Sequence, residues 1–390
     1  MTVGFDAFLT EDQRDARDLA RRFAEESVEP RAAEIDRDDE FPWELYGRMA
    51  ELGFLGLNVS PEYGGVGADE LTMALVMEEI ARASGTVANA LLLAKLQTEL
   101  ILRFGTPEQC QDVVPDVVAG RRICLIAVTE PDAGTDVSGI HTRAVRADGG
   151  WHITGTKAFM TAGAVGDVAV VLARTSAEGR HDALTTFLVP RSPDGDKAKG
   201  FVTGHKDDLM GMRGLATAGI VLDDTWVPES AALGPEGEGF HNVMRSFDNG
   251  RIVIACLALG LTVRALEESV SYSRERHAFG RSIENFQAVQ LMLADMAVDV
   301  HSARHAIHHA ARLKDKGLPF SVEASMAKLI ASDAAVRSTS NAVQVHGGYG
   351  YTKESVVERL FRDAKLSQIY EGTNQIQRVI IARHLLRAHR

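Results

Sequence analysis

The 390-residue sequence has few cysteines and a deficit of positive charge, and both features exclude whole classes of protein. Its three cysteines, Cys110, Cys124 and Cys256, lie far apart in a pattern that matches no metal-ligand spacing. We therefore expect no metal site and no disulfide framework, as in a protein of a reducing compartment. The formal net charge of −12 disfavours nucleic-acid binding as the main role, because that binding needs a basic face.

Long apolar runs are also missing. No stretch approaches the roughly 20 apolar residues of a membrane-spanning helix. The N-terminal segment MTVGFDAFLTEDQRD has no basic stretch followed by an apolar one, as a signal peptide would. We expect a cytoplasmic protein without membrane insertion. Proline is scarce in the last third, where only Pro319 follows Pro235, and this scarcity favours long helices.

Secondary-structure patterns change twice along the chain. Helical patterns fill the first third and begin at Thr10 and Gln13, which are spaced as a capping box. Short runs rich in β-branched residues follow from about Arg122, and Gly and Pro separate them as in an antiparallel sheet. Between Arg281 and Lys316 neither Gly nor Pro occurs, and apolar residues recur on one face, which predicts a bundle helix.

The chain is therefore predicted to be mostly α-helical with an inserted all-β domain. The boundaries lie where the patterns change, near Arg122 and just after Pro235. The predicted parts are an N-terminal α-helical domain over residues 1–121, a middle β domain over residues 122–235 and a C-terminal α-helical bundle domain over residues 236–390.

Three segments carry residues suited to binding a phosphate. A turn after a predicted strand reads AVTEPDAGTD at residues 127–136, and strand ends offer free backbone N–H groups. A second turn reads HGGYGY at residues 346–351, and a cluster of arginines reads RERHAFGR at residues 274–281. Taken singly, an ordinary β-turn, an inter-helix loop and a solvated basic helix end explain these segments at least as well.

A candidate general base lies in IYEGTNQIQR, residues 369–378. Asn374 and Gln377 are spaced as a capping box that opens the last helix, and Glu371 stands just before it, beside Gly372. A carboxylate held in a poorly hydrated cleft there would have a raised pKa, as a general base needs. A surface carboxylate that interacts with the helix dipole is the alternative.

In this order and at these separations, TEPDAGTD, FGR, QVHGGYGY and YEGTNQIQR resemble the acyl-CoA dehydrogenase family. The resemblance covers nearly the whole chain. It implies a helical N-terminal domain, a middle antiparallel β-barrel-like domain and a C-terminal four-helix bundle, assembled as a homotetramer. It also implies FAD as cofactor, between the β domain and the bundle, and oxidation of an acyl-CoA thioester to the 2,3-enoyl-CoA. Electron-transfer flavoprotein is the acceptor that this family implies.

The resemblance also implies roles for individual residues. Glu371 matches the catalytic base that removes the α-proton, while the β-hydrogen leaves as hydride to flavin N5. The matching FAD-binding positions are Ile126, Val128, Thr129, Gly134, Thr135, Phe159, Thr161, Arg276, Phe279, Gln287, Gln344, Gly347, Gly348, Thr373 and Gln375. Those from Arg276 to Gly348 would hold the ADP part of a neighbouring subunit's cofactor. The matching substrate-binding positions are Thr135, Asp248, Arg251, Tyr370 and Gly372.

The sequence departs from the family pattern at three places. Some members place the base on the helix that begins near FDNGR, where this chain has Gly250, so Glu371 is the remaining candidate. The family often reads W-I-T-N where this chain has Phe159 followed by Met-Thr-Ala, and Leu215 and Ala216 follow MRG. The last two differences leave the detail of the thioester cleft open, but not the reaction class.

Other functions fit the same fold. An acyl-CoA oxidase would pass electrons to oxygen, and a dehydrogenase of carrier-protein-bound acyl groups would reject free CoA esters. A nitroalkane oxidase is disfavoured, because relatives with that activity carry Asp at the position of Glu371. A non-catalytic scaffold subunit is disfavoured as well, because the base and the FAD contacts are retained.

Overall fold

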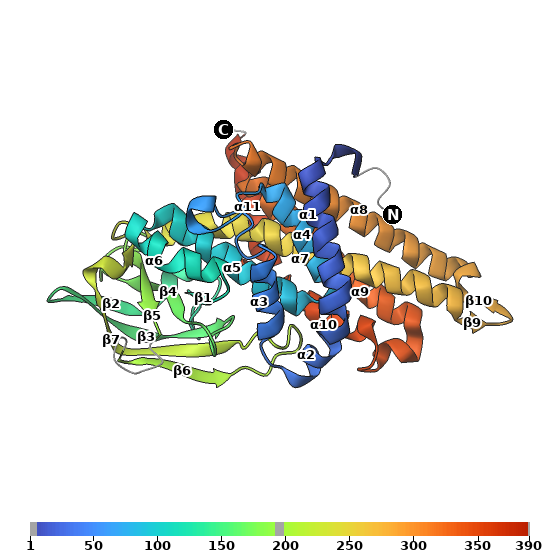
Figure 1. Ribbon diagram of the computed structural model, residues 1–390, viewed down its shortest axis with the longest axis horizontal. Helices are drawn as coiled ribbons and strands as arrows, with labels where there is room; N and C mark the ends of the chain where they lie inside the picture. The colour runs from blue at the N-terminus through green and yellow to red at the C-terminus, as the bar shows by residue number, and fades with distance from the viewer. Residues whose placement is uncertain (1–5, 192–198, 389–390) are drawn as a thin grey trace.

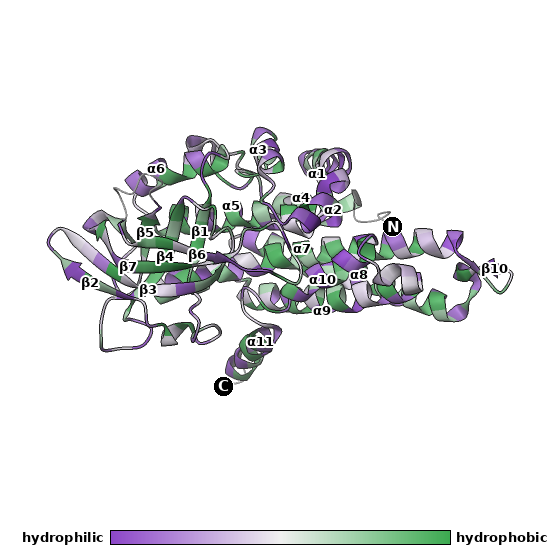
Figure 2. Cartoon of the chain, turned by 90° about the horizontal axis from the view of Figure 1, so that it is seen from below, coloured by the Kyte–Doolittle hydropathy of each residue, from purple (hydrophilic) through white to green (hydrophobic). Residues whose placement is uncertain are grey.

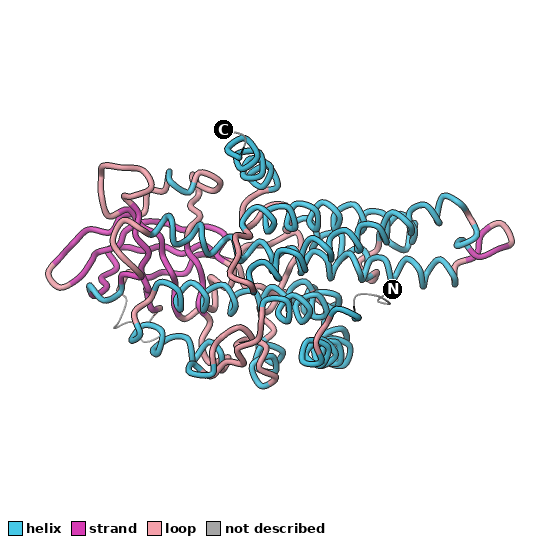
Figure 3. Tube along the Cα trace, turned by 90° about the horizontal axis from the view of Figure 1, so that it is seen from above, coloured by secondary structure: helices cyan, strands magenta, loops and turns pink. Residues whose placement is uncertain are grey.

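The computed structural model describes residues 6–191 and 199–388 (Figure 1). Helices at both ends of the chain flank a β-sheet from its middle, which confirms the mostly helical fold with an inserted β domain. The sheet lies at one end of an elongated molecule, and long helices extend to the other end (Figure 3). Within the described ranges, no helix combines the length and the apolar character needed to cross a lipid bilayer.

The N-terminal part consists of helices joined by turns and, over residues 52–69, by a longer loop. Thr10 caps the first helix as predicted: its hydroxyl accepts the Gln13 N–H, and the Gln13 side chain accepts the Thr10 N–H. The helices are α1 (Glu11–Phe23), α2 (Ala32–Asp38), α3 (Trp43–Glu51), α4 (Glu70–Ala83), α5 (Gly85–Phe104) and α6 (Pro107–Val118).

The middle part is a single twisted sheet whose hydrogen-bonded path runs β6-β7-β3-β2-β4-β5-β8, with β1 beside β4. Both β4 and β5 are buried along nearly their whole length, because α5 packs on β1 and α7 packs on β5. The strands are β1 (Cys124–Ala127), β2 (Arg143–Ala147), β3 (Gly150–Met160), β4 (Val168–Arg174), β5 (Leu184–Pro190), β6 (Phe201–Lys206), β7 (Ala218–Pro228) and β8 (Ala232–Leu233).

The sequence predicts an antiparallel sheet, but the sheet also contains a parallel pair of strands. β1 pairs with β4 in parallel, from Cys124 opposite Val168 to Ala127 opposite Val171. The β2–β3 hairpin lies between them in the sequence, and this long connection lets both strands run in the same direction. Gly and Pro spacing reports tight turns but not such crossovers, so the parallel pair could not be predicted from it.

The C-terminal part is a helical bundle. Helix α8 begins at Gln287 and not near Arg281, because a small hairpin and a 3₁₀ turn occupy the intervening residues. The elements are α7 (Gly239–Glu275), β9 (His277–Ala278), β10 (Arg281–Ser282), α8 (Gln287–Asp315), α9 (Ser321–His346), α10 (Val356–Leu366) and α11 (Asn374–Ala388). Helix α11 projects from the body of the molecule toward the C-terminus (Figure 2).

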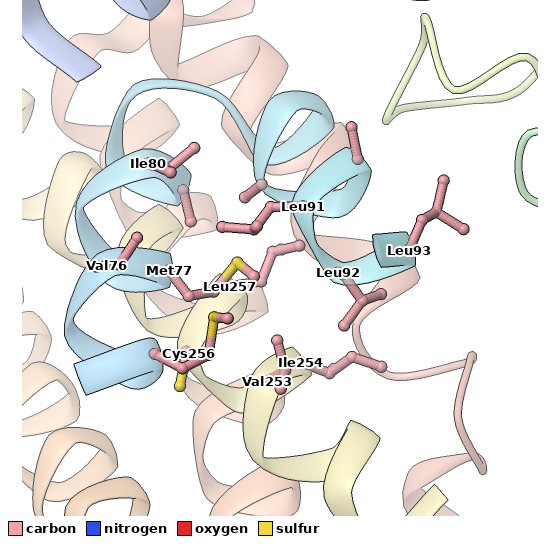
Figure 4. Packing of buried hydrophobic residues seen from close by; sticks show 14 of the residues in the cluster. Val76, Met77, Ile80, Leu91, Leu92, Leu93, Val253, Ile254, Cys256 and Leu257 are labelled. Carbon is pink, nitrogen blue, oxygen red and sulfur yellow. The ribbon is translucent and has the colours of Figure 1, made fainter. Parts of the chain in front are cut away.

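One core joins the N-terminal helices to the bundle. Side chains from α4, α5 and α7 meet there, among them Met77, Leu91 and Leu257, all fully buried (Figure 4). Each such side chain stabilises the fold by about 1.5–3 kcal/mol relative to exposure. The helices approach closely because Gly260 on α7 has no side chain: a Cβ there would lie 2.5 Å from the Ala81 Cβ. This contact fixes α7, which carries several of the candidate site residues.

Replacing Gly260 with Ala is therefore expected to destabilise the protein by about 1–3 kcal/mol, because two helix backbones must separate. Urea unfolding measures the change. Gly47→Ala is the matched control: a Cβ at Gly47, also inside a helix, meets nothing within 4 Å. That control is expected to be neutral or to stabilise by up to about 1 kcal/mol. Equal stability of the two variants would contradict this account of the α4–α7 contact.

Candidate functional site

A buried ion pair holds the turn that follows β1. The Lys157 ammonium is fully buried and donates to Glu130 Oε1 at 2.9 Å and to the Val128 carbonyl at 3.0 Å. Glu130 also accepts the backbone N–H groups of His141 and Thr142, at 2.6 and 2.9 Å. Burial lowers the pKa of Lys157 to about 8. Burial also acts to raise the pKa of Glu130, but Lys157 and the hydrogen bonds outweigh it, so this pKa is lowered.

This ion pair brings the predicted flavin-contacting residues of the β domain together. The Ala158 N–H donates to the Thr129 carbonyl at 2.9 Å, so the turn after β1 lies against the end of β3. Phe159 stands at that end with φ +60° and 65% of its surface exposed. A bulky residue in the left-handed region is strained, and such strain clusters at functional sites. Val128 is buried, and Ile126 and Thr161 are half-buried.

The turn itself is open to solvent. Gly134 and Thr135 are exposed, and a Cβ built on Gly134 would meet nothing within 4 Å. A ligand can therefore approach the backbone there.

The predicted ADP-binding residues gather at the far end of the bundle. Arg276, Gly347 and Gly348 line a pocket of about 570 Å³ together with Tyr272 and His346, whose rings stack at 4.2 Å. Three further predicted residues do not line this pocket: Phe279 is 95% exposed in the turn of the β9–β10 hairpin, Gln287 opens α8, and Gln344 lies in the last turn of α9. An arginine beside glycine-lined backbone, as in this pocket, suits a phosphate group.

The sheet and the β9–β10 end of the bundle, which carry these two groups, lie at opposite ends of the molecule (Figure 1). Glu238, at the start of α7, bridges to β5 of the sheet, whereas Arg276 caps the other end of α7. Helix α7 has 37 residues and is therefore about 55 Å long. Val128 and Ile126 pack in one cluster with Val243, near the start of α7, so most of the length of this helix separates the two groups.

The segment with Glu371 forms a turn in the left-handed region. Glu371 has φ +53° and Gly372 has φ +89°. Such a pair is unfavourable for a residue with a Cβ and requires contacts from elsewhere to hold it. The Gln377 side chain supplies two of them, because its Nε2 donates to the Gly372 carbonyl at 2.9 Å and to the Glu371 carbonyl at 3.3 Å.

The predicted capping box of Asn374 and Gln377 is wrong. Thr373 caps α11 instead, since its hydroxyl accepts the Ile376 N–H at 3.3 Å. Asn374 is buried, and its side chain accepts from Lys328 and donates to Asp333. Both predicted cap residues point into the protein, where long-range partners replace the helix end as hydrogen-bond partners. Gln375 is exposed on the opposite face of α11.

One carboxylate oxygen of Glu371 is withdrawn from solvent. The residue as a whole is half-buried, but its Oε2 is buried and has no hydrogen-bond partner. Burial raises the pKa of Glu371 from 4.5 to about 7, against the pull of Arg251 and Lys328. A Cβ on Gly250 would lie 2.9 Å from this oxygen and 3.2 Å from Leu96 Cδ2, so the carboxylate sits between α7 and α5.

The predicted substrate-binding residues differ in how far they are buried. Arg251 is buried and donates to Asp248, whose Oδ1 also accepts the Ser321 hydroxyl at 2.9 Å. Arg251 Nε is buried without a partner, and burial lowers the pKa of this guanidinium. The Tyr370 hydroxyl is likewise buried and unpaired, and burial raises its pKa above the usual range. Thr135, by contrast, lies on the exposed turn of the β domain.

Sequence patterns did not single out Glu130, Lys157 or Lys328. Glu130 and Lys157 each stand inside a recognised motif, TEP and GTK, but their pairing spans 27 positions of the sequence. Lys328 lies in the stretch SMAKLIAS, where small and apolar neighbours flank a lone cation. A lysine in such surroundings is the one local signal that could have indicated burial.

Family comparisons agree with this architecture. Models of the acyl-CoA dehydrogenase N-terminal, middle and C-terminal domains match residues 10–121, 125–225 and 237–386. The chain belongs to the acyl-CoA dehydrogenase family, whose members act on CH–CH donors and depend on FAD.

Individual relatives match along nearly their whole length. An acyl-CoA dehydrogenase of Bacillus subtilis (strain 168) is 41% identical over 97% of this chain and 99% of its own. Butyryl-CoA dehydrogenase from Megasphaera elsdenii superposes with a TM-score of 0.93 at 38% identity, covering 97% and 99%. A chain from the structure described as an electron transferring flavoprotein of Acidaminococcus fermentans superposes with 0.94 at 41% identity, also covering 97% and 99%.

Replacing Lys157 with Met is expected to destabilise the protein by about 3–5 kcal/mol, because Glu130 is left buried without its cation. Urea unfolding measures the loss. Arg180→Met is the matched control, since Arg180 pairs with Asp136 at 3.0 Å and both side chains are more than 60% exposed. Its expected cost is below about 1 kcal/mol. Similar losses in both variants would show that burial does not distinguish these ion pairs.

Replacing Glu371 with Gln is expected to stabilise the folded protein at pH 8 by about 1–3 kcal/mol. The folded pKa near 7 exceeds the ordinary 4.5, so folding opposes ionisation of this group. The penalty is absent below pH 4.5, grows up to pH 7 and is complete above it. Urea unfolding at pH 5 and pH 8 measures the difference between variant and wild type, with the exposed Glu62→Gln as control. A difference that is the same at both pH values contradicts the raised pKa.

Proposed function

We propose that the chain is an acyl-CoA dehydrogenase in which Glu371 removes the α-proton of an acyl-CoA thioester to yield the 2,3-enoyl-CoA. The observation that carries this proposal is the desolvated Glu371 carboxylate, which has no partner at Oε2 and a pKa near 7. A base with its pKa near the working pH is the most effective proton acceptor. Gly250 contributes no side chain beside that oxygen, where a Cβ would lie only 2.9 Å from it.

The residues present fit FAD. On the β domain, Ile126, Val128, Thr129, Phe159 and Thr161 would hold the flavin ring, and Gly134 with Thr135 would approach the pyrophosphate. Exposure of Phe159, which leaves a large ring uncovered in a strained conformation, supports this assignment. Thr373 and Gln375 would complete the contacts next to Glu371. When bound, FAD supplies the acceptor for the β-hydrogen and its electron pair.

Glu371 would hold the abstracted proton on its carboxylate. Arg251 and Lys328 keep enough positive charge nearby for this carboxylate to be ionised before reaction. The Glu371 backbone N–H would donate to the thioester carbonyl and stabilise the negative charge that develops on its oxygen. Asp248, Arg251, Thr135, Tyr370 and Gly372 are the proposed contacts of the substrate. Short acyl chains are the first to test, because a solved relative is a butyryl-CoA dehydrogenase.

Assembly into a homotetramer is part of the proposal. Arg276, Phe279, Gln287, Gln344, Gly347 and Gly348 would hold the ADP part of a neighbouring subunit's FAD. The distance of about 55 Å along α7 supports this, because these residues cannot serve the cofactor of their own β domain. We expect electron-transfer flavoprotein as the electron acceptor in the cytoplasm, in keeping with the Acidaminococcus fermentans relative.

Glu371→Gln is expected to retain FAD and to lose about 10²–10⁴-fold of turnover, since proton removal loses its base. The purified wild-type protein should be yellow, and butyryl-CoA should bleach its flavin absorbance without oxygen. Glu62→Gln, an exposed change of the same kind, should behave like wild type. Flavin reduction by Glu371→Gln at near the wild-type rate would refute the assignment. Peroxide formation in air would identify an oxidase instead.

A further inference from the structure

Lys328 lies directly behind the turn that carries Glu371. Its side chain is fully buried in α9, and its ammonium donates to the Gly372 carbonyl at 2.9 Å and to Asn374 Oδ1 at 2.8 Å. A fully buried lysine is costly unless its charge and its hydrogen bonds are used. Neither hydrogen bond is part of the backbone pairing of a helix or strand, so the lysine stabilises the turn itself.

Two of the hydrogen bonds that hold the left-handed turn end on the same atom. The Gly372 carbonyl accepts both Lys328 Nζ and Gln377 Nε2, each at 2.9 Å. Asn374 extends the clamp, because its Oδ1 accepts Lys328 Nζ and also the Ser332 hydroxyl at 3.0 Å. Helix α9 therefore fixes both the carbonyl that follows Glu371 and the start of α11. The direction of the Glu371 side chain follows from this clamp.

Lys328 and Glu371 also interact electrostatically. Burial lowers the pKa of Lys328 to about 7, while Glu371 acts to raise it. Reciprocally, Lys328 acts to lower the pKa of Glu371 against burial. The other charged groups that act on the pair are Arg251 on α7 and Asp333 on α9. Arg251 is bound to Asp248, and Asp333 is bound to Asn374, Gln368 and Arg378.

We propose that Lys328 is a positioning residue for proton abstraction, which holds the Glu371 turn through the Gly372 carbonyl and stabilises the carboxylate form of Glu371 with its charge. This inference rests on the proposed role of Glu371 as base. Lys328 touches neither thioester nor flavin in this scheme, and its effect reaches the reaction only through Glu371.

The charge has a consequence for the pH dependence. Proton abstraction requires ionised Glu371, so its rate rises with pH through the pKa of that group. Removal of a nearby cation raises the pKa of a carboxyl group. In a plot of rate against pH, the part where the rate rises is called the limb here. A neutral residue at position 328 therefore moves this limb to higher pH, whereas loss of the clamp alone lowers the rate equally at every pH.

The test compares Lys328→Gln and Lys328→Met with Lys328→Arg and Ser332→Ala in the full-length, FAD-loaded protein. Anaerobic flavin reduction by butyryl-CoA is followed from pH 5 to pH 9. The neutral variants are expected to move the limb upward by about one pH unit. The infrared carboxyl band that Glu371→Gln abolishes should titrate with the same shift, independently of turnover. Ser332→Ala removes a clamp hydrogen bond without changing charge and should leave the limb in place.

Lys328→Arg keeps a positive charge over the whole pH range, so it is expected to slow the reaction without moving the limb upward, and it also serves if the neutral variants do not fold. A limb and a carboxyl band that stay in place in the neutral variants would overturn the proposal. So would an upward shift in Lys328→Arg equal to that of a neutral residue. These results are separable from failure of the base assignment, because in that case Glu371→Gln itself would retain near wild-type flavin reduction.

Discussion

Exclusion of water from one carboxylate oxygen is the constraint on which the rest of the candidate site depends. Folding places Glu371 Oε2 between α5 and α7 with no hydrogen-bond donor, and burial raises its pKa to about 7. Such an arrangement costs stability, so neighbouring structure must enforce it. The close α4–α7 contact fixes one wall, and hydrogen bonds from Lys328 and Gln377 hold the strained turn that presents the side chain.

A second buried carboxylate shows how strongly the number of hydrogen-bond donors decides the direction in which burial shifts a carboxyl pKa. Glu130 is also buried, yet Lys157, Thr142 and the backbone of His141 satisfy it, and its pKa falls below the usual range. The same side-chain type therefore has a lowered pKa as a structural anchor in the β domain and a raised pKa at the bundle. Burial alone does not distinguish these roles, whereas the count of hydrogen-bond donors does.

The length of α7 separates two sets of residues that would serve the same kind of ligand. Its first residues lie against the sheet that carries Phe159, and its last residue adjoins the pocket of Arg276 and Gly347. The first set includes exposed residues of the turn after β1, and the second set lines an open pocket at the other end of the helix. This geometry accounts for aromatic side chains such as Phe159 and Phe279 that remain open to solvent at the surface.

Local patterns determined what depends on near neighbours: the helix–sheet–helix order, the Thr10–Gln13 capping box and the place of Glu371 just before the last helix. Gly and Pro spacing and helical periodicity report such short-range geometry directly. Tertiary structure alone decided the parallel β1–β4 pair, the inward turn of Asn374 and Gln377, and the approach of Lys328 to the Glu371 turn. These depend on partners that lie tens of residues away, because burial lets any suitably placed donor or acceptor replace the local one.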